Sequence, residues 1–157
     1  ASVLAERLSG SYKMLHLPDG LSQDSLHMLM TCEPQIKEIG DLISRTDVLL
    51  FGIGTAMRMA DQRHIADDVR KQLVDNHAVG EALGQYCDIE GKLIYSTNNI
   101  GLSLPDVVKV PNVIAVAGGQ EKASAIIGVM RACQKGILII DEQAAEGMRQ
   151  LLQISAL

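Results

Sequence analysis

The hydrophobic positions of the chain form unbroken runs in some places and helical spacings in others. Apolar runs over residues 47–51, 113–117 and 137–140 predict buried strands, covered on both faces as in a parallel sheet. Apolar residues three or four positions apart predict amphipathic helices. These predicted helices cover 2–9 with Gly10 as the stop, Pro34 to about Arg45, 67–74, Ala123 to about Cys133, and the segment after Asp141.

The remaining segments have weaker hydrophobic patterns. Residues 12–17 predict a further strand that ends in a turn at 18–20, and strands over 85–88 and 93–97 predict a β-hairpin joined at 89–91. We expect a loop running into a helical turn over 22–30, a loop with some helix over 55–64, a loop over 75–84 and a short helix over 104–108. Alternating strands and helices predict an α/β fold with a mainly parallel sheet, flanking helices and a β-hairpin insertion.

One connection carries a candidate chemistry. Gly118 and Gly119 follow the strand at 113–117, and the next helix begins within a few residues. The first N–H groups of a helix and the positive end of its dipole favour an anion, and the nearby Lys122 adds a full positive charge. The same glycines are also typical of an ordinary strand–helix turn, so the local pattern leaves both interpretations open.

Composition narrows the class of protein. The 157 residues, 47% of them hydrophobic, suffice for one domain or a large piece of one. A net charge of −5 and an aromatic content of 3% argue against a nucleic-acid surface in this segment. Three widely spaced cysteines favour a reducing cytoplasm. No apolar run approaches the roughly 18 residues needed to span a bilayer, so we expect no membrane partner. The start without Met or a signal-peptide pattern indicates a chain cut from something longer.

Other candidate motifs are incomplete. Gly52-x-Gly54 resembles a dinucleotide fingerprint, but Met57 occupies the third glycine position. The four histidines have no metal-binding spacing, so we expect no metal and no cofactor. Glu81, between Gly80 and Gly84, could bind sugar hydroxyls or act as a general base, although its spacing favours an exposed loop glutamate. Arg58 and Arg63 could pair with a phosphate or be solvated.

Several segments together resemble the sugar-binding domain of SorC-type bacterial transcription regulators. They occur in the same order along the chain as in members of this family, and they cover almost the whole chain. Each segment alone is a weak signal, but together they are a specific one. The matching pieces are Gly52-Ile53-Gly54, Ala78-Val79-Gly80-Glu81, Asp88-Ile89-Glu90-Gly91, residues 113–119 with Lys122-Ala123 and Ala125-Ile126, and residues 138–142 with Ala144-Ala145.

The resemblance implies a fold related to glucosamine-6-phosphate deaminase and ribose-5-phosphate isomerase, used to sense a phosphorylated sugar. It implies that residues 1–157 are the C-terminal part of the effector domain, without the N-terminal helix-turn-helix domain that binds DNA, in a homodimer or tetramer. Lys122 and the glycine pair would bind a phosphate, and Glu81 would bind hydroxyls. The effector-binding residues implied or suggested are Lys122, Glu81, Gly118, Gly119, Gly54, Gln62 and Arg63.

One position departs from this pattern. A close member of the family has two consecutive arginines after Met-Ala, where this chain has Asp61-Gln62-Arg63 after Met59-Ala60. Hydrogen bonds to a charged partner contribute about 1.5–3 kcal/mol, against about 1 kcal/mol for neutral pairs, so Gln62 weakens a contact to phosphate. The candidate effectors are therefore fructose-1,6-bisphosphate and a monophosphorylated sugar.

Two functions follow from these features. The first is a non-enzymatic sensor whose effector shifts the population of a DNA-binding regulator. The second is a sugar-phosphate isomerase or deaminase of the same fold, with Glu81 as the base. The enzyme needs a second acid/base group, for which the sequence offers His77 without a recognisable motif. Of these two functions, we expect the non-enzymatic sensor.

Overall fold

The computed structural model describes residues 2–17 and 20–153 and contains two compact units. The first consists of the chain up to Arg45 together with Asn98–Ile100. The second consists of Thr46–Thr97 together with the chain from Gly101 onward, and it contains all the strands that the structure describes.

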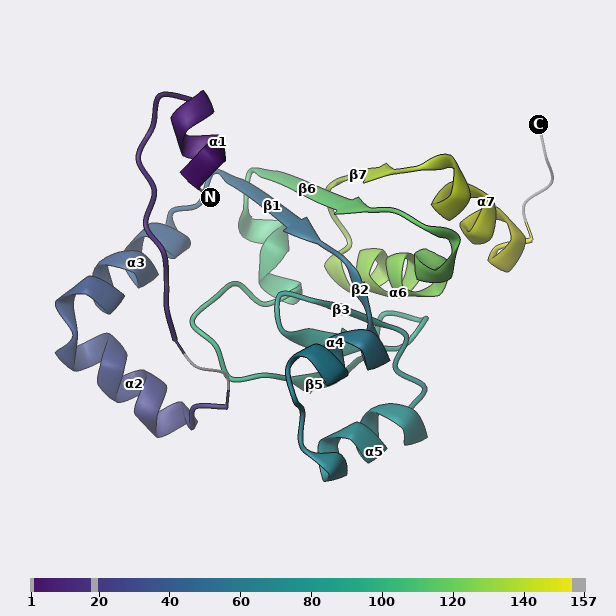
Figure 1. Ribbon diagram of the computed structural model, residues 1–157, viewed down its shortest axis with the longest axis horizontal. Helices are drawn as coiled ribbons and strands as arrows, with labels where there is room; N and C mark the ends of the chain where they lie inside the picture. The colour runs from purple at the N-terminus through teal and green to yellow at the C-terminus, as the bar shows by residue number, and fades with distance from the viewer. Residues whose placement is uncertain (1, 18–19, 154–157) are drawn as a thin grey trace. The chain divides into compact units, whose positions relative to one another are not determined.

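The described residues of the first unit form the helices α1 (Ser2–Arg7), α2 (Gln23–Cys32) and α3 (Pro34–Ser44) (Figure 1). The predictions of α1 and α3 are confirmed. For 22–30 we expected a loop running into a helical turn; the helical part is present, but the loop is wrong, because α2 already begins at Gln23. The Ser22 hydroxyl accepts a hydrogen bond from the Ser25 N–H at 3.1 Å and so caps the first turn of α2.

The predicted strand over 12–17 is also wrong. These residues pair with no strand in the part of the chain that the structure describes, and a strand is stable only when its backbone groups find a neighbouring ladder. The Lys13 ammonium instead forms an ion pair with Glu38 of α3. Residues 18 and 19 of the predicted turn lie outside the described residues.

The second unit is built on a parallel sheet of β1 (Val48–Gly52), β6 (Asn112–Ala117) and β7 (Ile137–Ile140), in the order β1-β6-β7. Helix α6 (Ala123–Cys133) runs along one side of this sheet (Figure 1). Helix α7 (Glu142–Leu151) follows β7 and packs beside α6. The predicted α/β fold is confirmed.

The core lies between the sheet and α6. Every second residue of β6 points into it, so the strand alternates between buried and more exposed positions. Buried residues of α6 fill the space from the other side, and the short helix η1 (Pro105–Lys109) contributes Val107. The buried members include Phe51, Val107, Val113, Ala115, Ala117, Ala125, Ile126, Val129 and Cys133.

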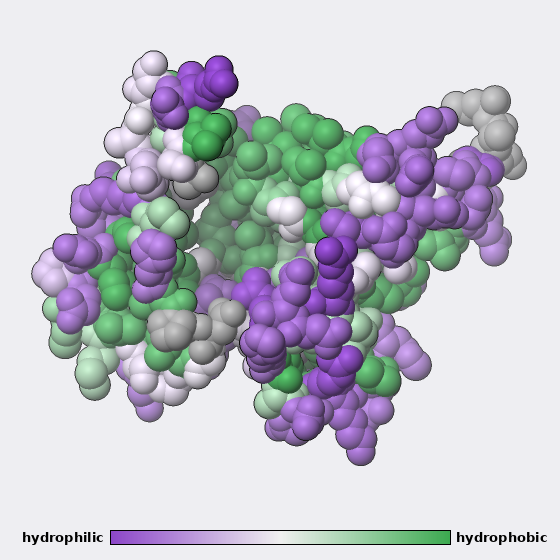
Figure 2. All heavy atoms as spheres, in the orientation of Figure 1, coloured by the Kyte–Doolittle hydropathy of each residue, from purple (hydrophilic) through white to green (hydrophobic). Residues whose placement is uncertain are grey.

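The other side of the sheet is apolar and exposed. Leu50 of β1 lies opposite Ile114 of β6, which lies opposite Ile137 of β7, so a row of aliphatic side chains crosses the sheet. Leu50 is 56% exposed and Ile137 is 64% exposed. The space-filling view shows the hydrophobic surface over these strands (Figure 2). The prediction that these strands are buried on both faces is therefore wrong for all three, since α6 covers a single face and Val116 of β6 is also exposed.

An antiparallel sheet extends the second unit in the order β2-β3-β4-β5. Its strands are β2 (Gly54–Thr55), β3 (Gly80–Ala82), β4 (Gln85–Cys87) and β5 (Leu93–Ser96). The predicted hairpin is confirmed as β4 and β5. The expected loop over 75–84 is wrong, because β3 lies within it. Three short helices complete the unit: α4 (Ala56–Gln62), α5 (Asp67–Asp75) and η2 (Gln120–Lys122).

Candidate functional site

The candidate site lies at the carboxyl ends of β1 and β6. These strands are parallel neighbours, with Gly52 opposite Val116, so the chain leaves both at the same edge of the sheet. After β1 it enters β2 and α4, and after β6 it enters the glycine pair and η2. Ligands of α/β folds bind at this edge. A cavity of about 470 Å³ lies here, lined by Phe51, Gly52, Ile53, Gly54, Arg58, Met59, Gln62, Arg63, Glu81, Leu83, Val116 and Lys122.

Most of the residues singled out from the sequence come together in this cavity. Lys122, Glu81, Gly54, Gln62 and Arg63 all line it, although they come from four different segments. Gly118 and Gly119 are not among its lining residues. Arg58, which the sequence left open between a phosphate contact and a solvated side chain, also lines the cavity.

Glu81 is buried at the base of the site. It lies in β3 opposite Gly54 of β2, and only 3% of the residue is exposed. Its Oε1 atom accepts hydrogen bonds from the Gly84 N–H at 2.7 Å and from Arg63 Nη2 at 3.3 Å. The interpretation of Glu81 as an exposed loop residue, which its spacing favoured, is therefore wrong. An ionised carboxylate is costly to bury unless it is paired, and the guanidinium of Arg63 provides that pairing.

Gly54 leaves the space that Met59 and Glu81 occupy. A Cβ atom at Gly54 would lie 2.4 Å from Met59 Cγ and 3.9 Å from Glu81 Oε2. A side chain at this position would displace Met59, which lines the same cavity. Within the Gly52-x-Gly54 pattern, Gly54 therefore serves the packing of β2 against Met59 of α4.

The carboxylate of Asp141, the residue that follows β7, holds the glycine pair through the Gly119 N–H. Gly119 has φ 96°, a conformation that favours glycine, and its N–H donates to Asp141 Oδ2 at 2.9 Å and Oδ1 at 3.1 Å. The Asp141 carboxylate also accepts the Ala144 N–H at 2.8 Å. These two backbone donors, first Ala144 and then Gly119, lower the pKa of Asp141, and the positive charge of Lys122 adds to the effect. The N–H of Gly119 is thus already engaged by the protein.

Lys122 closes the turn and points its charge into the site. Its N–H donates to the Gly119 carbonyl at 3.1 Å, which forms the single turn of η2. The side chain lines the cavity and is half-buried. The cavity therefore has three cations, Arg58, Arg63 and Lys122, and one carboxylate, Glu81. This positive balance, in a chain with a net charge of −5, suits an anionic ligand with hydroxyl groups.

Other chemistries find less support in the described residues. Within residues 2–17 and 20–153, no group of three or more potential ligands could hold a metal ion. All four histidines are exposed, and none lines the cavity. Across the same residues, no helix combines the length and the apolar character needed to cross a bilayer.

Comparison with known proteins identifies relatives that match most of the chain. Residues 1–150 match the family of sugar-binding domains. The chain is 36% identical over 143 residues to the central glycolytic genes regulator of Bacillus subtilis (strain 168), and 38% identical over 143 residues to that of Priestia megaterium. Each alignment covers 91% of this chain and 42% of the regulator. The chain therefore spans less than half the length of these relatives.

A solved structure agrees with these sequence matches. A SorC family transcriptional regulator from Enterococcus faecalis superposes with a TM-score of 0.84 at 38% sequence identity. The superposition covers 94% of this chain and 60% of that one. The similarity therefore extends through both compact units and includes the segments that form the cavity.

Proposed function

The chain belongs to the sugar-binding domain family of SorC-type transcription regulators, and from this premise we propose that its cavity binds a phosphorylated sugar as a regulatory effector. The single observation that carries the proposal is the meeting of Lys122 and Glu81 in one cavity at the carboxyl ends of β1 and β6. The lysine provides charge for a phosphate, and the carboxylate provides acceptors for hydroxyl groups.

In the proposed mode of binding, the two ends of the sugar contact different elements. A phosphate lies against the Lys122 ammonium, near the start of α6, where the helix dipole also favours negative charge. The hydroxyls face Glu81, whose orientation is fixed by Arg63 and by the Gly84 N–H. The Asp141 carboxylate already holds the Gly119 N–H. The glycine pair therefore contributes by positioning Lys122.

We propose that the effector is sensed without chemical turnover. An isomerase or deaminase needs a second acid/base group beside Glu81, and His77 does not line the cavity. The Arg63 guanidinium beside Glu81 Oε1 also stabilises the charged carboxylate and so makes it a weaker base. The named relatives are regulators, which favours sensing over catalysis.

In the cell, the proposed domain acts on DNA indirectly. An effector that binds one arrangement of the protein more tightly shifts the population toward it, by no more than the difference in its affinities. A separate helix-turn-helix domain would contact the operator of a carbohydrate-metabolism operon, and contacts between subunits of a dimer or tetramer would transmit the shift. We place this regulator in the cytoplasm, where phosphorylated sugars arise.

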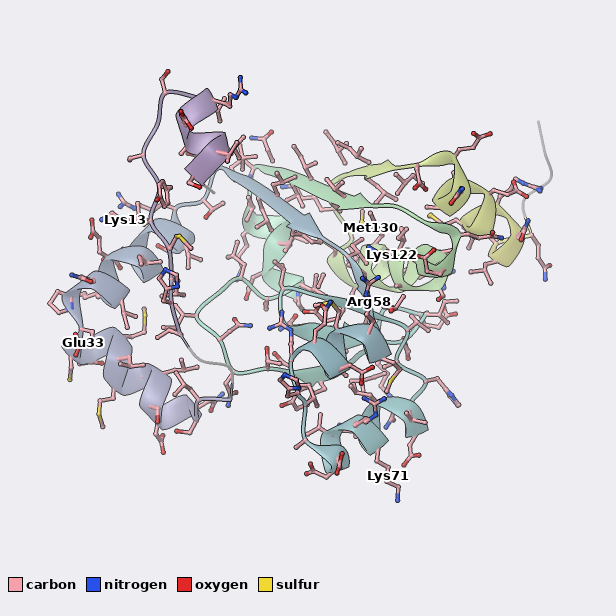
Figure 3. All side chains as sticks on the ribbon, in the orientation of Figure 1. Lys13, Glu33, Arg58, Lys71, Lys122 and Met130 are labelled. Carbon is pink, nitrogen blue, oxygen red and sulfur yellow. The ribbon has the colours of Figure 1, made fainter. Side chains whose placement is uncertain are left out.

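Titration calorimetry on the full-length protein tests the proposal. Lys122→Ala should weaken binding of fructose-6-phosphate and of fructose-1,6-bisphosphate by at least about 10-fold, because a charge-assisted contact is lost. The matched control is Lys71→Ala, which removes an exposed lysine of α5 that lies away from the cavity (Figure 3). Equal affinity in wild type and Lys122→Ala would reject the proposal. Conversion of either sugar phosphate, followed by NMR, would reject the non-enzymatic role.

A further inference from the structure

The three cations of the cavity differ in how they are compensated. Arg63 Nη2 lies 3.3 Å from Glu81 Oε1, so this pair is neutral in sum. Among the residues that the structure describes, neither the Arg58 guanidinium nor the Lys122 ammonium has an ion-pair partner within 4.0 Å. Two positive charges on the walls of one cavity therefore remain available to a ligand.

Helix α4 directs Arg58 toward the ligand space together with Gln62. The two residues are four positions apart, so they lie on the same face of the helix, one turn from each other. Both line the cavity, as do Met59 and Arg63 of the same segment. Since Arg63 is paired with Glu81, the Arg58 guanidinium and the Gln62 amide are the groups of this wall that can donate several hydrogen bonds to phosphate oxygens.

Lys122 reaches the same cavity from a different element. It follows β6, whereas α4 follows β1 and β2, and β1 and β6 are neighbouring strands. Figure 3 shows Arg58 rising from α4 beside Lys122, in agreement with the cavity that both line. The neutralised Arg63–Glu81 pair also lines this cavity, so it offers sugar hydroxyls a carboxylate oxygen without adding net charge.

We propose that Arg58 is the second anion-binding residue of the site and that the effector carries two phosphates, one bound by Lys122 and the other by Arg58 with Gln62. The inference rests on the proposed function of the cavity and deepens it. Arg58 supplies, one turn earlier in α4, the charge that Gln62 lacks. The neutral residue at position 62 therefore does not select a monophosphorylated sugar.

The test compares two sugars that differ by one phosphate, on the full-length protein. Titration calorimetry with fructose-1,6-bisphosphate and fructose-6-phosphate gives the ratio of their affinities for wild type, Arg58→Ala, Arg58→Lys and the control Lys71→Ala. We expect wild type to prefer the bisphosphate. Arg58→Ala should weaken bisphosphate binding about 10- to 100-fold and monophosphate binding less than about 2-fold, which removes the preference.

The remaining variants distinguish the loss of a positive charge from a loss of folding. Arg58→Lys should retain part of the preference because it keeps a positive charge, and Lys71→Ala should behave as wild type. Circular dichroism verifies that each variant is folded. An affinity ratio that Arg58→Ala leaves unchanged would overturn the inference while the sugar-phosphate function stands. A wild type that binds neither sugar would overturn both, and Lys122→Ala distinguishes the cases, since it should weaken both sugars.

Discussion

The Asp141 carboxylate binds the Gly119 N–H at 2.9 Å and so joins the end of β7 to the turn that follows β6. The two residues are 22 positions apart, and Asp141 is at the same time the N-cap of α7. One side chain thus fixes the turn that carries Lys122 and the start of the next helix. A Cβ atom at Gly118 would lie 2.7 Å from Asp141 Oδ2, so the close approach also depends on glycine.

We predict that Asp141→Asn lowers the stability of the fold at neutral pH by an amount that disappears in acid. Backbone donors lower the pKa of Asp141 below its ordinary value of 3.8. The unfolded chain therefore binds this proton first as the pH falls. The stabilisation by the carboxylate is complete well above pH 3.8 and is lost as the pH falls through the folded-state pKa.

Urea unfolding curves of wild type and Asp141→Asn between pH 7 and pH 3 measure this difference. The midpoints should be separate at pH 7 and should begin to converge as the pH falls below the ordinary value of 3.8. Asp75→Asn, at the exposed end of α5, serves as the control for removing a carboxylate. A separation that stays constant over the whole pH range would contradict the role of the ionised carboxylate.

A second prediction concerns the buried ion pair of the cavity. Arg63→Ala leaves the Glu81 carboxylate buried without its guanidinium and should reduce the free energy of unfolding by about 1.5–3 kcal/mol. Glu81→Gln keeps an oxygen for the Gly84 N–H and removes the charge. The double variant should therefore be less destabilised than the sum of the two single variants. Urea denaturation gives all four values, and strict additivity would show that the two residues do not interact.

The sequence predicted the parallel sheet because its strands are continuous apolar runs, and it predicted α6 and α7 from helical spacing. It missed β3, which has three residues and begins with Gly80. Such a strand has no local signal, because it exists through pairing with β2 and β4 on its two sides. The helix α2 was expected only as a single turn, although Ser22 as a cap before Leu26 and Leu29 is a signal for its start.

The site was predicted with the same limit, namely that contacts between residues far apart in the chain leave no local signal. Lys122 was singled out because charge, glycine pair and helix start are adjacent in sequence. The burial of Glu81 could not be predicted, since it depends on β3 lying between β2 and β4. Likewise, the bond from Gly119 to Asp141 joins residues far apart in the chain. Arg58 could be placed near the sheet edge but not in the cavity, because the expected loop over 55–64 had no defined face, whereas α4 has one.

A third prediction tests the packing of α6 on the antiparallel sheet. A Cβ atom at Gly128 would lie 2.4 Å from the Asp88 carbonyl oxygen and 3.0 Å from Val79 Cγ2. Since a backbone atom cannot move aside cheaply, Gly128→Ala should destabilise the fold by about 1–3 kcal/mol or more. Gly52→Ala is the matched control, because its nearest atom would be the Val116 carbonyl oxygen at 3.9 Å. Equal unfolding midpoints for the two variants would contradict the packing.

A fourth prediction uses the cysteines to observe the strand that carries Glu81. Cys87 of β4 lies opposite Gly80 of β3 and is fully buried. Burial, with smaller contributions from Asp88 and Glu81, raises the pKa of the Cys87 thiol to about 12. Burial also raises the pKa of Cys133, whereas Cys32 is exposed. Because the thiolate is the reactive form, N-ethylmaleimide at pH 8 should modify Cys32 quickly and the other two slowly.

Labelling of Cys87 then requires β4 to separate from its neighbours, so its rate reports the local opening of the β3–β4 pair. A sugar bisphosphate that binds Glu81 on β3 stabilises the closed form, and we expect it to slow the labelling of Cys87. Cys32 lies in the first unit and serves as the internal control in the same mass spectrum. Fructose should leave both rates unchanged, because it carries no phosphate for Lys122. If the bisphosphate slowed the labelling of Cys32 and Cys87 equally, it would be acting on N-ethylmaleimide itself. That result would contradict stabilisation of the β3–β4 pair by binding.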